Sequence, residues 1–292
     1  MRQGAYAFAP TLLILATACG GQPFSAGGAE LDASSVPDTA PRPAEASADR
    51  SEAAAPDGPS ADGSNLPVGP AVTEGLVLWL RADVGVTESN SGVSNWADWS
   101  GNHFDARQPD PTLQPVWLQA GVSSRPAVVF NAGSFLSLPG GFTDFSRGIS
   151  IFAIAEITDA SATCVDLVDL SNGAEIDDIT LGRHDGRVHY EVLDSDLHGD
   201  LFPIGRAHLL SVVHAPGRAV SLSLDSAPPT TGIFELPVTM TRQSNVVGRS
   251  LYADCGSLLG GIAEMLIYRR SLSDFERGQV ESYLQDRWSC CR

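Results

Sequence analysis

The C-terminal segment Gly260–Trp288 constrains the fold of this chain more than any other stretch, because it combines a buried strand with an amphipathic helix. Residues 262–268 read IAEMLIY, an apolar run that suits a central strand and is too short to span a membrane. Ser273 and Glu276 have the spacing of a capping box, which closes the first turn of a helix. Apolar residues then recur at helical spacing, at Phe275, Val280, Tyr283, Leu284 and Trp288. The pattern predicts a helix that packs on a sheet.

Short strand-like segments precede this pair at regular intervals. Residues 149–157 read ISIFAIAEI and are apolar on both faces, as an inner strand is. Four more such segments follow between residues 178 and 225, and the turn sequences HDG, SDLHGD and APGR separate them. Evenly spaced strands with turn residues between them are typical of a β-sandwich. With 43% hydrophobic residues in 292, the chain can bury one such core and leave a long segment over.

The closing strand and helix also carry a family resemblance. GGIAEMLIYRRSLSDFERGQVESYLQDRW resembles the last segment of concanavalin A-like, laminin G-like domains. GLVLWLRAD, WADWSGN, RPAVVFNAGSFLSLP and SNVVGRS resemble earlier segments of that family and occur in the same order. The resemblance implies an all-β fold over residues 71–292, a two-sheet antiparallel jelly-roll sandwich with a short C-terminal helix. It does not imply one function, because this fold hosts lectins, adhesion modules and glycosidases.

The N-terminus reads as an export signal. A short positive start and an apolar run lead to Ala16-Thr17-Ala18, which predicts a signal peptide over residues 1–18. These three residues fit an ordinary cleavage site, but with Cys19 directly after them they resemble the bacterial lipobox, which implies an acylated Cys19 as the membrane anchor. Gly20 in place of aspartate implies the outer membrane of the cell envelope. Residues 19–70 are rich in Ala, Ser, Pro, Asp and Gly and are predicted to form a disordered linker.

The negative net charge limits the classes of molecule that the protein is expected to bind. The formal net charge is -17, and all 18 basic residues are arginine. Such a surface repels phosphate backbones, so we expect no nucleic-acid partner. Divalent cations or neutral polymers fit better, and solubility alone is the simpler explanation of the charge.

One strand-like segment partly matches a glycosidase motif. Glycosidases of this fold carry E-x-D-x-x-E, and the chain has Glu175 and Asp177 but Thr180 in place of the third acid. Retaining hydrolysis needs two carboxyl groups about 5–5.5 Å apart. The missing acid predicts that the protein is not an enzyme.

Two turns offer oxygen ligands. Asp98 and Asn102 in the W-x-D-x-S-G-N turn, and Asp254 before the last strand, are of the type that calcium binds. A calcium site is therefore one interpretation. The alternative is that these side chains bond the backbone of their own turns.

The same turn contains a second tryptophan. Trp96 occupies the tryptophan position of the resembled family and is expected in the core, whereas Trp99 stands where that pattern is polar. An exposed indole can stack on a sugar ring, and His103 can add a hydrogen bond. The alternative is that Trp99 packs under a loop.

The cysteines indicate disulfides. Without Cys19, four remain in an exported domain, an even number. If the strands at 149–157 and 262–268 are antiparallel neighbours, the end of the first meets the start of the second, which brings Cys164 towards Cys255. Cys290 and Cys291 can pair with each other, with either of these, or between two molecules.

These observations predict an exported, lipid-anchored, non-catalytic binding module for a carbohydrate or a surface protein. The alternatives are a glycoside hydrolase of the same fold and a structural envelope protein without a soluble ligand. A concave carboxylate pair would favour the enzyme, and an aromatic cluster at a loop rim would favour the lectin.

Overall fold

The computed structural model describes residues 69–90, 92–159 and 161–291. The predicted signal peptide, the predicted acylation site Cys19 and the predicted linker up to residue 68 lie outside the described residues. Within them no helix has the length and hydrophobicity of a membrane span.

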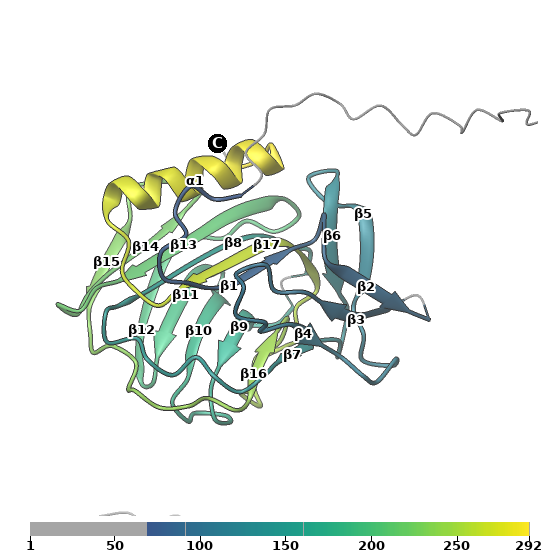
Figure 1. Cartoon of the computed structure of the whole chain (residues 1–292), viewed down its shortest axis with the longest axis horizontal. Helices are drawn as coiled ribbons and strands as arrows, with labels where there is room; N and C mark the ends of the chain where they lie inside the picture. The colour runs from purple at the N-terminus through teal and green to yellow at the C-terminus, as the bar shows by residue number, and fades with distance from the viewer. Residues whose placement is uncertain (1–68, 91, 160, 292) are drawn as a thin grey trace, which may run out of the picture. The chain divides into compact units, whose positions relative to one another are not determined.

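Two antiparallel sheets form the domain (Figure 1), which confirms the predicted all-β sandwich. Sheet A has eight strands within the described residues, in the order β15 (Thr230–Ile233), β14 (Ala219–Leu224), β13 (Ala207–His214), β8 (Ile149–Ile157), β17 (Gly260–Tyr268), β6 (Arg125–Phe130) and β5 (Val116–Val122), with β1 (Leu76–Arg81) paired to β17. Sheet B has nine in the same part of the chain, in the order β12 (Ser195–Leu201), β11 (Arg187–Val192), β10 (Ile179–His184), β9 (Cys164–Leu170), β16 (Asn245–Val247), β7 (Leu136–Leu138), β4 (Ala106–Arg107), β3 (Gly92–Trp96) and β2 (Val86–Ser89).

The strand β17 organises sheet A. All nine of its residues are buried, as its apolar sequence predicts. It pairs along one side with β8, from Gly260 opposite Ile157 to Tyr268 opposite Ser150. On its other side β6 pairs with its first residues and β1 with its later ones. β17 and β8 are therefore antiparallel neighbours, which is the arrangement from which the sequence predicted that Cys164 lies near Cys255.

The main core fills the space between the two sheets. Side chains alternate between the two faces of a strand, so every second residue points inward. Leu167, Leu181 and Tyr190 of sheet B are buried in one cluster with Ile151 and Met265 of sheet A. Burial of a large apolar side chain stabilises the fold by about 1.5–3 kcal/mol, so this layer holds the sheets together.

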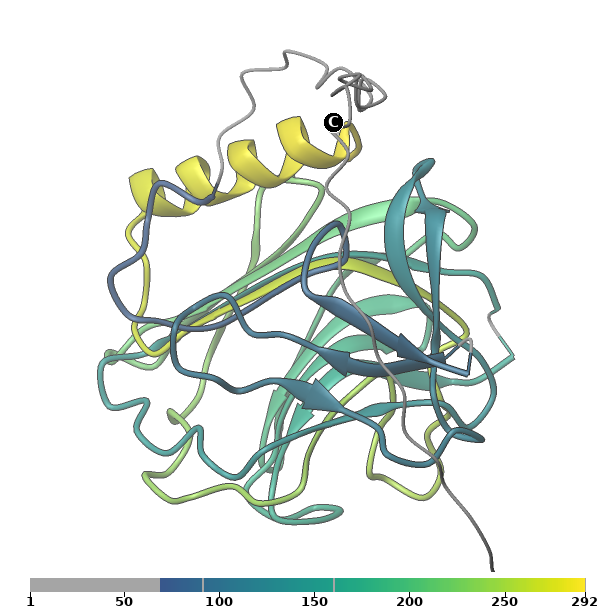
Figure 2. The same ribbon diagram turned by 45° about the vertical axis from the view of Figure 1, so that its right-hand side comes forward.

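The helix α1 (Asp274–Trp288) covers the outer face of sheet A (Figure 2). Ser273 is its N-cap, and both bonds of the predicted capping box with Glu276 are present. Leu284 and Trp288 pack with Leu266 in a second apolar layer. Phe275 does not belong to that layer.

The sequence pattern placed Phe275 on the apolar face, and this was wrong, because 76% of the residue is exposed. An α-helix turns about 100° per residue, so Phe275 lies about half a turn around the helix from Leu284.

A buried glutamate joins the helix to the sheet. Glu264 of β17 has no exposed surface. It accepts hydrogen bonds from Trp79 Nε1 at 2.6 Å, Tyr283 Oη at 2.8 Å and Trp288 Nε1 at 2.7 Å. Burial raises the pKa of this carboxyl, while the three donors oppose the shift. Hydrogen bonds from side chains of β1 and α1 to the Glu264 carboxyl group thus fix the position of the helix on sheet A.

Candidate functional site

The outer face of sheet B is polar, in contrast to the outer face of sheet A. In β10 and β11, Leu181, Val188 and Tyr190 point into the core. The residues between them face outward. Across β9 to β12 most of the outward-facing polar residues are acids or histidines. The set consists of Asp166, Asp169, Thr180, His184, His189, Glu191, Asp196 and His198. One set of strands therefore supplies both the core and a polar surface.

Cross-strand register brings these side chains together in two rows. The first row pairs Asp169 with Thr180, Thr180 with Glu191, and Glu191 with Asp196. Residues directly opposite each other in an antiparallel pair have Cβ atoms about 4.5–5.5 Å apart. Acids that are far apart in the sequence thus become neighbours on one surface.

The second row runs parallel to the first. It pairs Asp166 with Gly182, Gly182 with His189, and His189 with His198. A Cβ atom at Gly182 would lie 2.1 Å from the Val165 carbonyl oxygen and 2.9 Å from Asp166 Oδ1. Glycine is therefore required here, because the backbone of β9 at Val165 and Asp166 leaves no room for a Cβ atom.

A β-bulge places both aspartates of β9 on the outer face. Asp166 and Asp169 are three residues apart, so a regular strand would point them to opposite faces. The register shifts between Leu181 and Gly182, where Leu167 is the extra residue of β9. A bulge of this kind re-aims the side chains that follow it.

A loop fastened by a disulfide covers part of this face. The bond joins Cys164, at the start of β9, to Cys255, with the Cα atoms 4.8 Å apart. The Gly256 N–H donates to the Cys164 carbonyl oxygen at 2.9 Å. The loop of residues 250–256 also carries Tyr252, and with the strands it encloses a cavity of about 310 Å³. The chain also contains a second disulfide, between Cys290 and Cys291.

The Tyr252 hydroxyl connects two carboxyl groups. It lies within hydrogen-bond distance of Asp178 Oδ2, and 3.1 Å from Glu191 Oε1. A phenol has one hydrogen to donate, so it cannot donate to both groups at once. When the hydroxyl donates to Asp178, its contact with Glu191 is a hydrogen bond only if the Glu191 carboxyl group carries a proton and donates it to the Tyr252 oxygen.

Burial shifts the pKa values of several of these groups in the direction that favours the neutral form. The pKa of Asp166 is raised to about 8, first by burial and then by the charges of Asp169, Glu191 and Asp178. Burial and neighbouring acids also raise the pKa of Glu191 to about 7. Burial, with the charges of His198 and His184, lowers the pKa of His189 to about 4. At neutral pH Asp166 is thus largely protonated and His189 carries no charge.

Several polar atoms on this face are buried without a hydrogen-bond partner. They are Asp169 Oδ1, Asp178 Oδ1, Thr180 Oγ1 and His189 Nε2. Buried polar atoms in folded proteins almost always have a partner in the protein, in ordered water or in a ligand. Water or a ligand on the outer face of sheet B can supply the missing partners.

The W-x-D-x-S-G-N turn has a structural role. Both oxygens of Asp98 are occupied: Oδ1 accepts from Trp79 N at 2.9 Å and Ser100 N at 2.8 Å, and Oδ2 accepts from Ser100 Oγ at 2.8 Å and Phe104 N at 3.0 Å. Asn102 Nδ2 donates to the Leu76 carbonyl oxygen at 3.1 Å. These bonds tie the turn to β1, which supports the interpretation that its oxygens serve the backbone. Asp254 lies in a different loop, beside Cys255, and is exposed.

The two tryptophans of this turn have different environments. Trp96 is fully buried and donates from Nε1 to the Arg81 carbonyl oxygen at 2.8 Å. Trp99 is 48% exposed and lies against Gly85, where a Cβ atom would be 2.5 Å from its Nε1. His103 is exposed and has a φ of 62°. The turn that holds Trp99 and His103 is separate from the histidines and acids of β9 to β12.

The partial glycosidase motif divides between a loop and the polar face. Glu175 is exposed in the loop before β10 and has a φ of 60°. Thr180, which stands where the motif has its third acid, lies buried between Asp169 and Glu191. The motif places its acids along one strand. Here the acids beside Thr180 come instead from the two neighbouring strands, Asp169 from β9 and Glu191 from β11. The signal for Glu191 was the alternation of polar and apolar residues in RVHYEV, whereas CVDLVDL has no such alternation, because its two aspartates are three residues apart.

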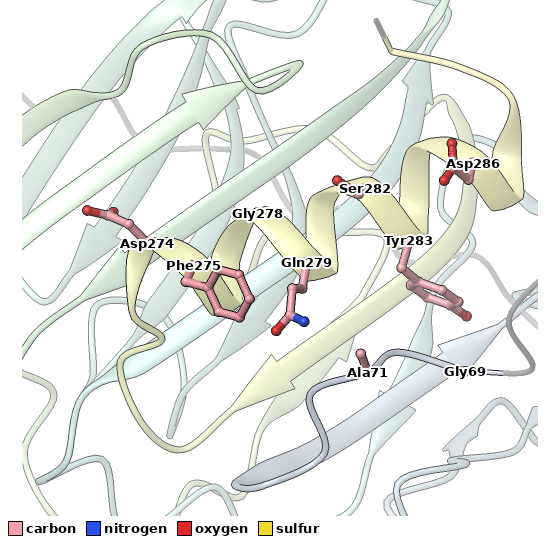
Figure 3. Close-up of a pocket in the computed structure, with 9 residues that line it drawn as sticks. All are labelled: Gly69, Ala71, Asp274, Phe275, Gly278, Gln279, Ser282, Tyr283 and Asp286. Atoms are coloured by element: carbon pink, nitrogen blue, oxygen red, sulfur yellow. The ribbon is translucent and has the colours of Figure 1, made fainter.

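A larger cavity of about 710 Å³ lies elsewhere, between α1 and residues 69–71 (Figure 3). Its polar lining includes Asp274, Ser282 and Asp286, which are exposed and already solvated. Size alone therefore does not make it the functional site, because the unpartnered buried atoms of Asp169, Thr180 and His189 lie on sheet B.

Comparisons with known proteins relate the chain by fold alone. No family model matches it, and a search of curated protein sequences finds no match. Among solved structures, domain 4 of AbnA, a GH43 extracellular arabinanase from Geobacillus stearothermophilus in complex with arabinotriose, has a TM-score of 0.50 and 18% identity, over 71% of this chain and 97% of that one.

Two further structures show the range of proteins that share the fold. The binding domain of Paraclostridial Mosquitocidal Protein 1 has a TM-score of 0.52 and 13% identity, over 72% of this chain and 52% of that one. Trypanosoma rangeli sialidase in complex with sialic acid has a TM-score of 0.50 and 16% identity, over 73% of this chain and 33% of that one. The chain thus spans about a third of the sialidase, and its neighbours include both enzymes and binding domains.

The buried carboxyl of Asp166 makes stability depend on pH. Its folded pKa of about 8 lies above the ordinary value of 3.8, so between these values the folded state holds a proton that the unfolded state has lost. Stability therefore falls as pH rises through this window and levels off above it. The lowered pKa of His189 opposes this slope less and less as pH rises above about 6.5, because the unfolded histidine then loses its own proton.

We expect the melting temperature to fall between about pH 6.5 and pH 8. Asp166→Asn should reduce that fall by at least about 2–4 °C, the shift that about 1 kcal/mol produces in a domain of this size. Calorimetry at the two pH values, with the exposed Asp254→Asn as control, measures the difference. An equal fall in all three proteins would contradict the assignment.

Proposed function

We propose that the protein is a non-catalytic carbohydrate-binding module and that the outer face of sheet B is its binding surface. The observation that carries the proposal is the cavity beside Tyr252, which Asp166, Glu191 and Asp196 line together with His189, whose buried Nε2 has no hydrogen-bond partner. Sugar hydroxyls both donate and accept hydrogen bonds, so one ligand can satisfy acids and hydroxyls together. The ring of Tyr252 adds an apolar surface at the rim of the same cavity.

The architecture supports this function. The AbnA domain was solved with arabinotriose, and this chain matches nearly the whole of that domain. The similarity concerns the fold, so the site residues of this chain carry the functional argument. We interpret the domain as laminin G-like on the sequence motifs described above. A surface protein is the other partner class that such a surface can bind.

A glycan array identifies the ligand, and titration of the best glycan then tests the surface. Tyr252→Phe removes one hydroxyl and keeps the ring, and Glu191→Gln keeps the shape of the carboxyl. Each should weaken binding about tenfold or more, because a hydrogen bond to a charged group contributes about 1.5–3 kcal/mol. Trp99→Ala, in the separate turn, is the matched control and should bind as the parent does.

Loss of binding in Trp99→Ala with full binding in Tyr252→Phe would place the site in the turn instead. A second candidate function, glycoside hydrolysis, is favoured by the contact of Tyr252 with both Asp178 and Glu191, because this hydrolysis uses a pair of carboxyl groups. Turnover of the bound glycan that disappears in Glu191→Gln would establish that function and remove the non-catalytic one.

We also propose that acylation of Cys19 anchors the protein to the cell envelope, at the outer membrane, after residues 1–18 are removed. The motif at Ala16-Thr17-Ala18 supports this. Cys19→Ser should release the protein from the membrane fraction or leave the precursor unprocessed. Fractionation followed by mass spectrometry of the N-terminus measures both, and equal membrane association of variant and parent would contradict the anchor.

A further inference from the structure

Three histidines meet at one end of the polar face of sheet B. His184 of β10, His189 of β11 and His198 of β12 come from three adjacent strands. One potential ligand atom from each lies within 4.8 Å of the others. We propose that these three histidines bind one divalent transition-metal cation of the zinc type.

The strand register makes this cluster. His189 and His198 are direct cross-strand partners, with ring centroids 4.8 Å apart. His184 is two residues beyond Gly182, the partner of His189, so it faces the same side. Its ring centroid lies 5.0 Å from that of His189 and 5.4 Å from that of His198.

The central histidine presents a nitrogen that nothing in the described residues satisfies. His189 is only 3% exposed, and its Nε2 is buried without a hydrogen-bond partner. The nearest carboxylate oxygens are Glu191 Oε2 at 3.7 Å and Asp196 Oδ2 at 3.8 Å, both beyond hydrogen-bond distance. A cation between these groups would satisfy all of them.

A carboxylate completes the set of ligands. Asp196 Oδ2 lies 2.9 Å from His198 Nε2, in addition to its position near His189. Three imidazole nitrogens and one carboxylate oxygen form a donor set that zinc accepts, and calcium prefers oxygen ligands. The proposed site is therefore distinct in its chemistry from the oxygen-rich turn at Asp98.

Small side-chain movements bring the donors to coordination distance. Ligands about 2.0–2.1 Å from a tetrahedral zinc stand about 3.3 Å apart. His189 is held in place by burial, whereas His184 and His198 are partly exposed and can turn towards it. The net charge of -17 attracts cations to the whole surface.

Zinc uptake tests the site without any sugar, so its outcome is separate from that of the carbohydrate proposal. The full chain, without a histidine tag, is treated with EDTA, dialysed and titrated with Zn²⁺ alone by calorimetry. We expect one zinc per chain, with no competition from an equal concentration of Ca²⁺. Co²⁺ in place of Zn²⁺ should give the intense visible absorption of a tetrahedral site.

Matched asparagine variants locate the ion. His198→Asn should weaken zinc binding about 100-fold or more, since loss of even an outer partner of a metal ligand costs about 10–100-fold. His103→Asn is the control, because this exposed histidine lies in the separate turn and asparagine tolerates its positive φ. His184→Asn provides a second partly exposed variant, so the test does not depend on the buried His189.

The inference is overturned if the parent shows no saturable zinc uptake. It is also overturned if His198→Asn and His184→Asn both bind zinc as tightly as His103→Asn does. Equal competition by Ca²⁺ would contradict the nitrogen ligands, and the faint spectrum of hydrated Co²⁺ would mean surface attraction only.

Discussion

The alternation of side chains in β9 to β12 is the constraint on which both the core and the candidate site depend. Each strand presents Val, Leu or Tyr to the sandwich and Asp, Glu or His to the outside. A shift of register by one residue would bury the acids and expose the core. The bulge at Leu167 modifies this rule at one place, and it brings Asp166 and Asp169 to the same face. The polar surface is thus a product of the same register that assembles the hydrophobic layer.

The two outer faces of the sandwich are covered differently. Sheet A hides its outer face under α1, where Glu264 bonds to side chains of the helix and of β1. Sheet B carries a short disulfide-fastened loop over β9, and its acids and histidines line a cavity beside Tyr252. Asp169 Oδ1, Thr180 Oγ1 and His189 Nε2 are buried on that face without hydrogen-bond partners. These atoms are the reason why we propose that sheet B binds a polar ligand on its outer face.

Sequence patterns predicted the architecture because they are local. The apolar run of β17, the capping box at Ser273 and the even spacing of strands each depend on neighbouring residues. The candidate site depends on register between strands instead. Thr180 read alone suggested a lost carboxylate, and only its partners Asp169 and Glu191 show that the acids are present. Asp98 and Asn102 show the opposite case. Their turn has a strong local sequence pattern, which suggested a calcium site, but their side chains bond the backbone of β1.

The central claim is that the outer face of sheet B, and not the tryptophan-containing turn, is the functional surface. Hydrogen–deuterium exchange on the full chain, with and without a saturating glycan chosen from the array, tests this most directly. The account predicts slower exchange in β9 to β12 and in residues 250–256 when the glycan is bound. Protection confined to residues 96–104, with unchanged exchange in β9 to β12, would contradict it.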